Sequence, residues 1–470
     1  MASLTDPLGL VRDATFGVAE LGRSLLGQMT GQERIRLAVT GLTRAGKTVF
    51  LTSLVANLLA AGRGQRTLPA LEQAAGGRLR AVRVVPAGVQ SMPRFDVAAH
   101  LTALAADPPA WPGRTDDLST LELTLEVERR SWLGGVLGTR SITLELLDYP
   151  GEWLLDLPML EQSYPAWSAA TLARLRTGPR EAVAREFLAF ADALPPQAPA
   201  DEALARRGFA LFREALLACR DQLGLRFLQP GRVLNPGPRG DAPILWFFPL
   251  PHPAAGGLAG LLARRHAAYV AHQRENFFEP HFRRFQRQAV LVDVLGALHA
   301  GQAAFEDTAE ALAAIATALR YGNGWLDWLT GTGVERAAFV ATKADHVPAR
   351  QRDALTALLG SLTGPPLDRA TAAGAATAVH ALAAIRCTED DVATLEGRPV
   401  AAVRGLLADG RSARIYPGEV PLRPPEPGFW AHGFFEMPEF QPPRLAPDGA
   451  LGVPHLGMDA LLAWLIGDLL

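Results

Sequence analysis

The 470-residue sequence predicts an α/β fold with a mostly parallel sheet, one antiparallel hairpin strand and a large helical insertion. Short apolar strands alternate with segments of helical periodicity, which is typical of a parallel sheet covered by helices. Around residues 119–148, apolar and polar residues alternate on both sides of a turn, as in an antiparallel hairpin. Between residues 152 and 286 the strand pattern stops, and helical segments punctuated by Gly and Pro replace it.

Composition narrows the class of protein. Apolar residues make up 49% of the chain and charged residues 20%, which indicates a globular protein. The net charge of -2 gives no basic excess, so we expect no nucleic-acid partner. Two cysteines exclude a disulfide framework and suit a reducing compartment. Without signal-peptide features or an apolar run of about 20 residues, the chain is predicted to be cytoplasmic, with no transmembrane segment.

The first of four predicted segments, residues 1–30, is an N-terminal amphipathic helix. It begins at Asp6 and Pro7, a good N-cap and first-turn pair, and apolar residues recur after them at helical spacing. We interpret this helix as packing on the main domain. The alternative is reversible docking on a partner or a membrane, which would place the protein at the periphery of the inner membrane.

The other segments are two parts of one core, residues 31–151 and 287–470, and a helical insertion domain, residues 152–286. In the first part, a strand that ends before Gly41 leads into a helix, and residues 62–118 are expected to be irregular with short elements. In the second part we expect strands at 289–295, 337–342 and 378–384, helices at 305–319 and 349–362, and a C-terminal helix.

A glycine-rich loop follows the first strand and opens a helix. Gly41–Thr48, GLTRAGKT, fits the pattern G-x-x-x-x-G-K-[ST] at every defined position. Such a turn points successive backbone N–H groups at phosphate oxygens, while Lys47 reaches the β- and γ-phosphates and Thr48 ligates Mg²⁺. The expected phosphate-binding residues are Gly41, Thr43, Arg44, Ala45, Gly46, Lys47, Thr48 and Val49.

The segment Asp148–Gly151 ends the second hairpin strand. An Asp-to-Gly turn is common by itself, but a DxxG motif belongs at this position after a glycine-rich loop of this kind. We expect Asp148 to hold Mg²⁺ through water and the Gly151 amide to sense the γ-phosphate.

Thr342–Asp345, TKAD, ends a later strand and has the form of the guanine-specificity motif NKxD with Thr in place of Asn. The Asp345 carboxylate matches the N1–H and N2–H₂ donors of guanine, and the stem of Lys343 lies over the base. His346 is included in this nucleotide-binding set, and Ala383–Arg386 is a candidate for the loop that contacts the base. Together the three motifs predict a P-loop GTPase core that binds GTP and Mg²⁺. An ATPase, or a scaffold that holds nucleotide with negligible turnover, is the alternative.

Three residues are candidates for catalysis, each with an alternative role. Thr115 is placed like the switch threonine that closes over Mg²⁺ and the γ-phosphate, or it is a loop residue that starts a turn. Glu152 stands where small GTPases orient the attacking water, or it is a surface carboxylate. Arg44 has the position of the P-loop arginine of guanylate-binding proteins and atlastins, a finger in cis, or it pairs with the insertion domain or a partner chain.

The residues in and around these motifs are more specific than the general GTPase pattern. The segments GLTRAGKTVFLTSLV, LLDYPGEWLLDLP, FEPHFRRFQRQAVLVDVLGALHAG and FVATKADHV resemble the YcjX-like family of bacterial P-loop GTPases, plausibly over residues 30–470. The resemblance implies a GTPase fold with a helical insertion, binding of GTP and Mg²⁺, and a cytoplasmic, stress-associated protein. The expected partners are GTP, GDP and a protein effector at the insertion domain, with a homodimer as a further alternative.

Overall fold

The computed structural model describes residues 32–86, 93–113, 117–130, 136–237, 242–253, 255–281, 285–318, 334–446 and 449–470. The predicted N-terminal helix, residues 1–30, lies outside these residues.

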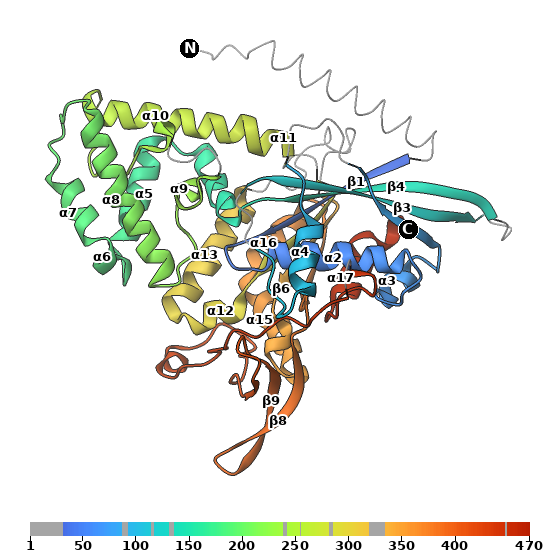
Figure 1. Ribbon diagram of the computed structural model, residues 1–470. Coiled ribbons are helices and arrows are strands. Elements are labelled where there is room, and N and C mark those ends of the chain that lie inside the picture. The colour runs from blue at the N-terminus through green and yellow to red at the C-terminus, as the bar shows by residue number, and fades with distance from the viewer. Residues whose placement is uncertain are drawn as a thin grey trace.

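A seven-stranded sheet forms the centre of the molecule, in the order β2-β3-β4-β1-β5-β6-β7 (Figure 1). Strands β4, β1, β5, β6 and β7 pair in parallel, whereas β3 is antiparallel to both of its neighbours. This confirms the predicted α/β fold with a mostly parallel sheet and one antiparallel hairpin strand. The strands are β1 (Gln32–Gly41), β2 (Leu79–Val84), β3 (Ser119–Arg130), β4 (Val136–Asp148), β5 (Arg287–Val292), β6 (Arg336–Ala341) and β7 (Ala376–Ala381).

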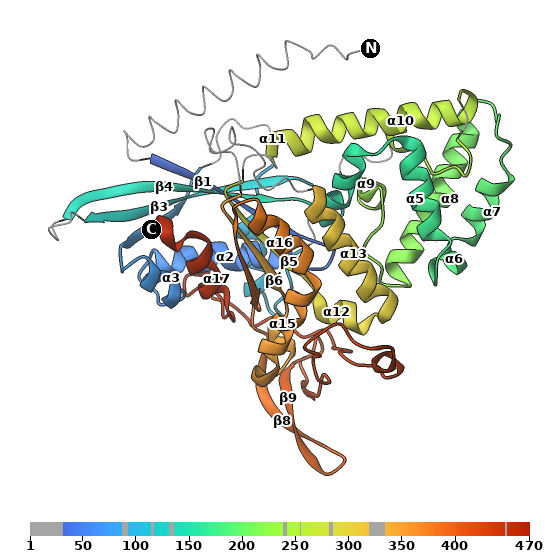
Figure 2. The ribbon, with the colours of Figure 1, turned by 180° about the vertical axis from the view of Figure 1, so that it is seen from behind.

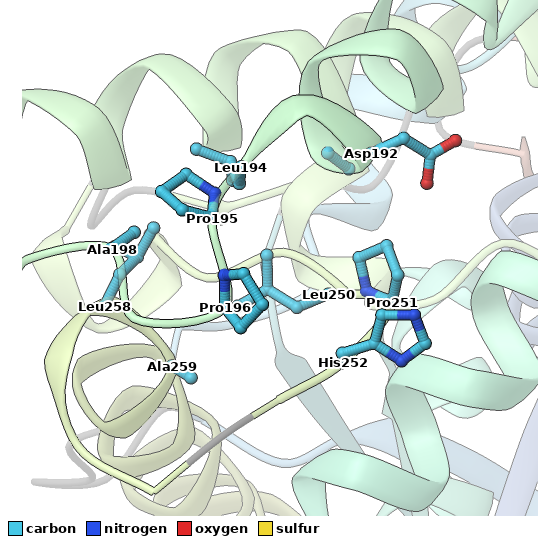
Figure 3. A pocket seen from close by; sticks show the side chains of 11 residues that line it. Asp192, Leu194, Pro195, Pro196, Ala198, Leu250, Pro251, His252, Leu258 and Ala259 are labelled. Carbon is cyan, nitrogen blue, oxygen red and sulfur yellow. The ribbon is translucent and has the colours of Figure 1, made fainter.

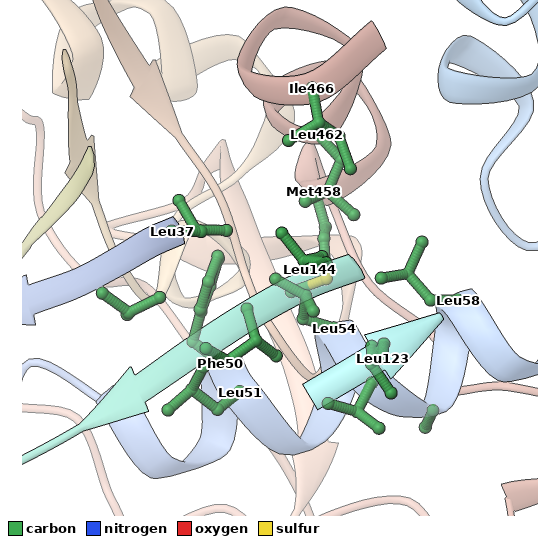
Figure 4. Close-up of a cluster of buried hydrophobic side chains, with 14 of the residues drawn as sticks. Leu37, Phe50, Leu51, Leu54, Leu58, Leu123, Leu144, Met458, Leu462 and Ile466 are labelled. Atoms are coloured by element: carbon green, nitrogen blue, oxygen red, sulfur yellow. The ribbon is translucent and has the colours of Figure 1, made fainter. Parts of the chain in front are cut away.

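Helices cover both faces of the sheet. Alternate side chains of β5 enter two different apolar clusters, Leu291 on one face and Val290 on the other. In the first cluster, Phe50 and Leu462 lie over the same strands although they come from opposite ends of the chain (Figure 4). Helices on that face are α2 (Lys47–Ala61), α3 (Pro69–Ala74), α4 (Val97–Ala105) and α17 (Met458–Ile466). On the other face are α12 (Val294–His299), α13 (Gln302–Ala318) and α15 (Arg352–Leu362).

A helical unit lies at one side of the sheet (Figures 1 and 2). Within the described part of 162–281 every regular element is a helix. The unit has its own aromatic core, in which Trp167 is fully buried between Phe212, Phe247 and His266. The assignment of residues 152–286 as a helical insertion domain stays a prediction. The main helices are α5 (Tyr164–Leu175), α6 (Arg180–Val183), α7 (Arg185–Ala193), α8 (Glu202–Asp221), α9 (Gly231–Leu234), α10 (Gly257–Gln273) and α11 (Glu279–His281).

After β7 the chain forms a small antiparallel sheet that the sequence analysis does not predict. It projects away from the central sheet (Figure 1). Its strands are rich in charged residues and largely exposed on both faces, so they lack the apolar alternation of a half-buried strand. Its strands are β8 (Thr388–Leu395), β9 (Arg398–Leu406) and β10 (Ser412–Ile415), while α16 (Gly364–Ala372) lies between α15 and β7 in the chain. No helix in the described part of the chain is long and apolar enough to cross a membrane.

The close packing of α8 generates a prediction for stability. A Cβ on Gly208 would overlap the ring of Phe248, which is fully buried, and come within 2.9 Å of Phe190. We expect Gly208→Ala to lower the free energy of unfolding by about 1–3 kcal/mol, measured by urea titration followed by circular dichroism. Gly360→Ala is the matched control, because Gly360 also lies inside a helix but a Cβ there meets nothing within 4 Å. The control should gain about 0.5–1 kcal/mol; equal effects of the two substitutions would contradict the packing described.

Candidate nucleotide-binding site

The predicted motifs meet at the carboxyl edge of the parallel strands. Strand pairing aligns Ala38 with Leu147, Gly41 with Leu291, and Val292 with Ala341. The residues that follow these strands therefore lie next to one another at one edge of the sheet. This is where α/β sheets of this kind bind ligands.

A cavity of about 900 Å³ opens at this edge, a volume suited to a nucleotide. A smaller cavity of about 100 Å³ lies within the helical unit, where Pro195, Leu250 and Pro251 line it (Figure 3). We assign nucleotide binding to the large cavity because it brings the sequence motifs together. The predicted residues that line it are Thr43, Arg44, Ala45, Gly46, Lys47, Thr48, Val49, Gly151, Glu152, Lys343, Asp345 and His346.

Gly41 and Asp148 lie at strand ends beside the cavity. Thr115 falls outside the described residues, so its assignment as a catalytic residue and Mg²⁺ ligand stays a prediction. Asp148 is 1% exposed and ends β4.

The glycine-rich loop has the shape that its sequence predicts. Strand β1 ends at Gly41, where a Cβ would lie 2.6 Å from the Leu291 carbonyl oxygen. Arg44 and Gly46 have φ of 66° and 81°, so the loop turns through left-handed conformations before α2 begins at Lys47. The Lys47 ammonium group donates to the Gly41 carbonyl oxygen at 3.4 Å, across the loop. The N-terminus of a 15-residue helix thus opens on the cavity.

The DxxG segment packs directly on this loop. A Cβ at Gly151 would overlap the Gly41 carbonyl oxygen and lie 2.8 Å from the Lys47 ammonium group. Glycine is therefore required at 151 for steric reasons in this arrangement. The Gly151 backbone amide therefore lies close enough to Lys47 to contact a ligand that Lys47 binds.

The residues expected to hold Mg²⁺ fit that ion by chemistry and position. The Thr48 hydroxyl is at the first turn of α2 and lines the cavity, while the Asp148 carboxylate lies at the end of the strand paired with β1. Both supply hard oxygen ligands, the kind that Mg²⁺ prefers.

From Gly151 the chain forms a 3-10 helix, η1 (Gly151–Glu161), which is hydrogen-bonded to the helical unit. Its buried Asp156 accepts hydrogen bonds from the Gly231 amide at 2.7 Å and from the Tyr269 hydroxyl at 2.5 Å. Trp153 donates to the Asn235 carbonyl oxygen at 3.0 Å, and the Arg232 guanidinium lies 3.7 Å from the centre of its ring. The segment next to the nucleotide cavity is thus tied to α9 and α10.

At the base end of the cavity, Lys343 and Asp293 form an ion pair of 2.5 Å. Burial raises the pKa of Asp293, but Lys343 outweighs it, so the pKa lies below its usual value. Thr342 donates from its hydroxyl to the Val292 carbonyl oxygen at 3.4 Å. This hydrogen bond joins the ends of β5 and β6.

Asp345 is 2% exposed and accepts two hydrogen bonds from one residue. The Cys387 amide donates to its carboxylate at 2.8 Å and the Cys387 thiol at 3.1 Å. Burial and the Asp345 charge raise the pKa of Cys387 far above its ordinary value, so the thiol keeps its proton. Residues Ala383, Ala384 and Ile385 of the predicted base loop line the cavity, whereas Arg386 is not among the lining residues.

Sequence reasoning missed Asp293, Cys387 and Arg226, which also line the cavity. Asp293 had a usable signal, because it directly follows a strand that is buried along its whole length. Cys387 and Arg226 had none, since only the fold brings them to the cavity.

Asp156 gives a prediction of pH dependence. Burial raises its pKa to about 6, against the hydrogen bonds from Tyr269 and Gly231, so the folded protein binds this proton more tightly than the unfolded chain. The resulting stabilisation is full below about pH 4 and is lost as the pH rises through 6. Between pH 4 and 7 we expect the wild-type protein to lose about 1–3 kcal/mol in free energy of unfolding relative to Asp156→Asn, measured by urea titration. Asp192→Asn, on the surface beside Arg176, should leave the pH dependence of the free energy of unfolding as in the wild-type protein. If Asp156→Asn also showed the wild-type pH dependence, Asp156 would not be the group with the raised pKa.

The chain matches a protein-family model, that of the YcjX-like family, DUF463, over residues 35–470. A protein of Escherichia coli (strain K12) named Ras-like GTPase YcjX is 38% identical over 448 residues, which cover 92% of this chain and 95% of that protein. A protein of the same name from Shewanella oneidensis is 33% identical over 483 residues, which cover 98% of this chain and 99% of that protein. Because the family model and both relatives extend over nearly the whole chain, this protein belongs to the YcjX-like family.

Proposed function

We propose that this protein binds GTP with Mg²⁺ in the large cavity and hydrolyses it to GDP at a low intrinsic rate. The observation that carries the proposal is the buried carboxylate of Asp345, which lines the same cavity as the glycine-rich loop. Guanine has two adjacent N–H donors that match this carboxylate, and adenine does not. The names of the two relatives agree with this activity. A cytoplasmic, stress-related role is the setting that the family resemblance suggests.

The phosphate end of the cavity supplies the chemistry. The amides from Thr43 to Thr48 and the Lys47 ammonium group bind and orient the β- and γ-phosphates. Mg²⁺, held by Thr48 and Asp148, would neutralise charge on those phosphates. Gly151 donates its amide to the γ-phosphate, Glu152 orients the attacking water, and Arg44 stabilises charge on the γ-phosphate oxygens. Catalysis rests on positioning and electrostatics.

Nucleotide state is passed on through η1. The γ-phosphate is the only part of GTP that GDP lacks, and Gly151, the first residue of η1, packs against Lys47 and the Gly41 carbonyl oxygen. Any movement of Gly151 is carried along η1 to Asp156, which the helical unit holds through Gly231 and Tyr269. The helical unit is thus the proposed reader of nucleotide state and the proposed docking surface for a protein effector.

Base specificity is tested by Asp345→Asn. The Asn side chain presents one acceptor and one N–H donor, which fits the carbonyl group that xanthine carries in place of the guanine amino group. We expect GDP affinity to fall at least about 10²-fold, since a charge-assisted pair of hydrogen bonds is lost, and XDP to bind better than GDP. Isothermal titration calorimetry with GDP, XDP and ADP measures this, with Asp353→Asn on the surface of α15 as control. A wild-type protein that prefers ADP would be an ATPase.

Hydrolysis is tested in single-turnover reactions with [γ-³²P]GTP. Arg44→Ala should lower the rate by about 10- to 100-fold, the value of one hydrogen bond to a charged group, with GDP affinity little changed. Arg63→Ala, an exposed residue just after α2, is the control and should keep the wild-type rate. An unchanged rate for Arg44→Ala removes its catalytic role. No turnover by the wild-type protein would leave a scaffold that holds nucleotide.

A further inference from the structure

One arginine of the helical unit reaches the nucleotide cavity. Arg226 lies in the loop between α8 and α9 and lines the cavity together with the glycine-rich loop, Gly151 and Glu152. Arg44 and Arg226 are the arginines among the described residues that line it. One belongs to the core, and the other is brought from the helical unit by folding.

The backbone of Arg226 is held in place by the core. Asp307 on α13 accepts hydrogen bonds from the amides of Arg226 and Phe227 through one oxygen, at 2.5 and 2.8 Å. Its other oxygen pairs with Arg180 of α6. Asp307 is 3% exposed, and the Phe227 ring is buried with the Arg174 guanidinium 4.3 Å from its centre. This anchor fixes the main chain and leaves the Arg226 side chain to the cavity.

One nitrogen of the Arg226 guanidinium lacks an acceptor among the described residues. This nitrogen, Nη1, is buried. A buried N–H group without an acceptor destabilises the folded protein, and a ligand that supplies an acceptor would remove that cost. Burial lowers the pKa of Arg226, and the charge of Arg44 lowers it further, while Asp293, Asp307 and Glu152 act in the opposite direction. An oxyanion in the cavity would satisfy the N–H group and separate the two like charges.

We propose that Arg226 is a catalytic arginine, supplied in cis by the helical unit, that binds the γ-phosphate of GTP in the transition state; this rests on the proposed GTPase function. The oxygen of water forms a bond to the γ-phosphorus while the bond from that phosphorus to the β–γ bridging oxygen breaks. GDP keeps the electron pair, the proton of water passes to the released phosphate, and Arg226 keeps its own proton. Its planar fork of donors matches the γ-phosphate oxygens, on which charge accumulates.

The proposal gives the helical unit a direct part in the chemistry. Arg226 sits on the loop that Asp307 anchors, and the same loop continues to Gly231, which binds Asp156 of η1. Displacing the helical unit far enough to break the Asp307 hydrogen bonds would therefore withdraw Arg226 and release η1 together. A bound effector would change the rate of hydrolysis through one rigid movement.

The test compares Arg226→Gln and Arg226→Lys with Arg206→Gln, an exposed residue of the same helical unit. Single-turnover GTP hydrolysis, GDP affinity by calorimetry, and formation of a GDP–aluminium fluoride complex are measured on the full chain. We expect Arg226→Gln to lose about 10³-fold in rate and the aluminium fluoride complex, at unchanged GDP affinity and melting temperature. Arg226→Lys should recover only a minor part of the rate, because an ammonium group offers no fork. Arg206→Gln should match the wild-type protein.

Four results would overturn the proposal. Wild-type rate and an intact aluminium fluoride complex in Arg226→Gln would show that Arg226 does not touch the γ-phosphate, while the GTPase function stands. Equal losses in rate and GDP affinity would make it a ground-state binding residue. Absence of both turnover and the aluminium fluoride complex in the wild-type protein overturns the GTPase function as well. If Arg226→Gln does not fold, Arg226→Lys decides, because a full rate with Lys at this position excludes the forked contact.

Discussion

The contact of Gly151 with the glycine-rich loop is the constraint on which the rest of the site depends. Strands β1 and β4 are parallel neighbours, so the loop after one and the turn after the other leave the sheet side by side. The distance between them is so short that a Cβ at 151 would overlap the Gly41 carbonyl oxygen. No side chain separates the group that binds phosphate from the first residue of η1. In the proposed function, a change at the phosphates would therefore move η1 directly.

The same kind of backbone packing continues into the helical unit. A Cβ at Gly231 would overlap the Glu152 carbonyl oxygen, so α9 lies against η1 as closely as η1 lies against the glycine-rich loop. Buried hydrogen bonds then fix the direction of this contact: Asp156 binds both Gly231 and Tyr269, and Gln229 donates to the Leu155 carbonyl oxygen at 2.5 Å. Binding free energies are reciprocal. If the nucleotide changes the affinity of the helical unit for a partner, that partner must change the affinity for the nucleotide by the same factor.

The sequence predicted features that depend on neighbouring residues, and it missed contacts between residues that are far apart in the chain. The loop Gly41–Thr48, the hairpin that leads to Asp148, and the strand before Asp345 are each local, and periodicity and turn chemistry suffice to place them. Cys387 reaches Asp345 from the loop between β7 and β8, and Arg226 reaches the cavity from the loop between α8 and α9, so no local pattern predicts these contacts. Strands β8 to β10 were missed because their exposed, charged residues lack the apolar alternation by which strands are recognised.

The charged side chains around the cavity would make the position of the helical unit depend on whether GTP or GDP is bound. Arg44 and Arg226 line the same cavity; burial and the charge of Arg44 lower the pKa of Arg226, and Asp293, Asp307 and Glu152 raise it. A γ-phosphate would supply negative charge to pair with the two guanidinium groups. If Arg226 binds the γ-phosphate as proposed, release of that phosphate removes the acceptor of Arg226 while Asp307 still holds its backbone, and the helical unit would then be held less tightly in the GDP state. On this reasoning the helical unit senses the nucleotide twice, by packing through Gly151 and by charge through Arg226, and the two act in the same direction.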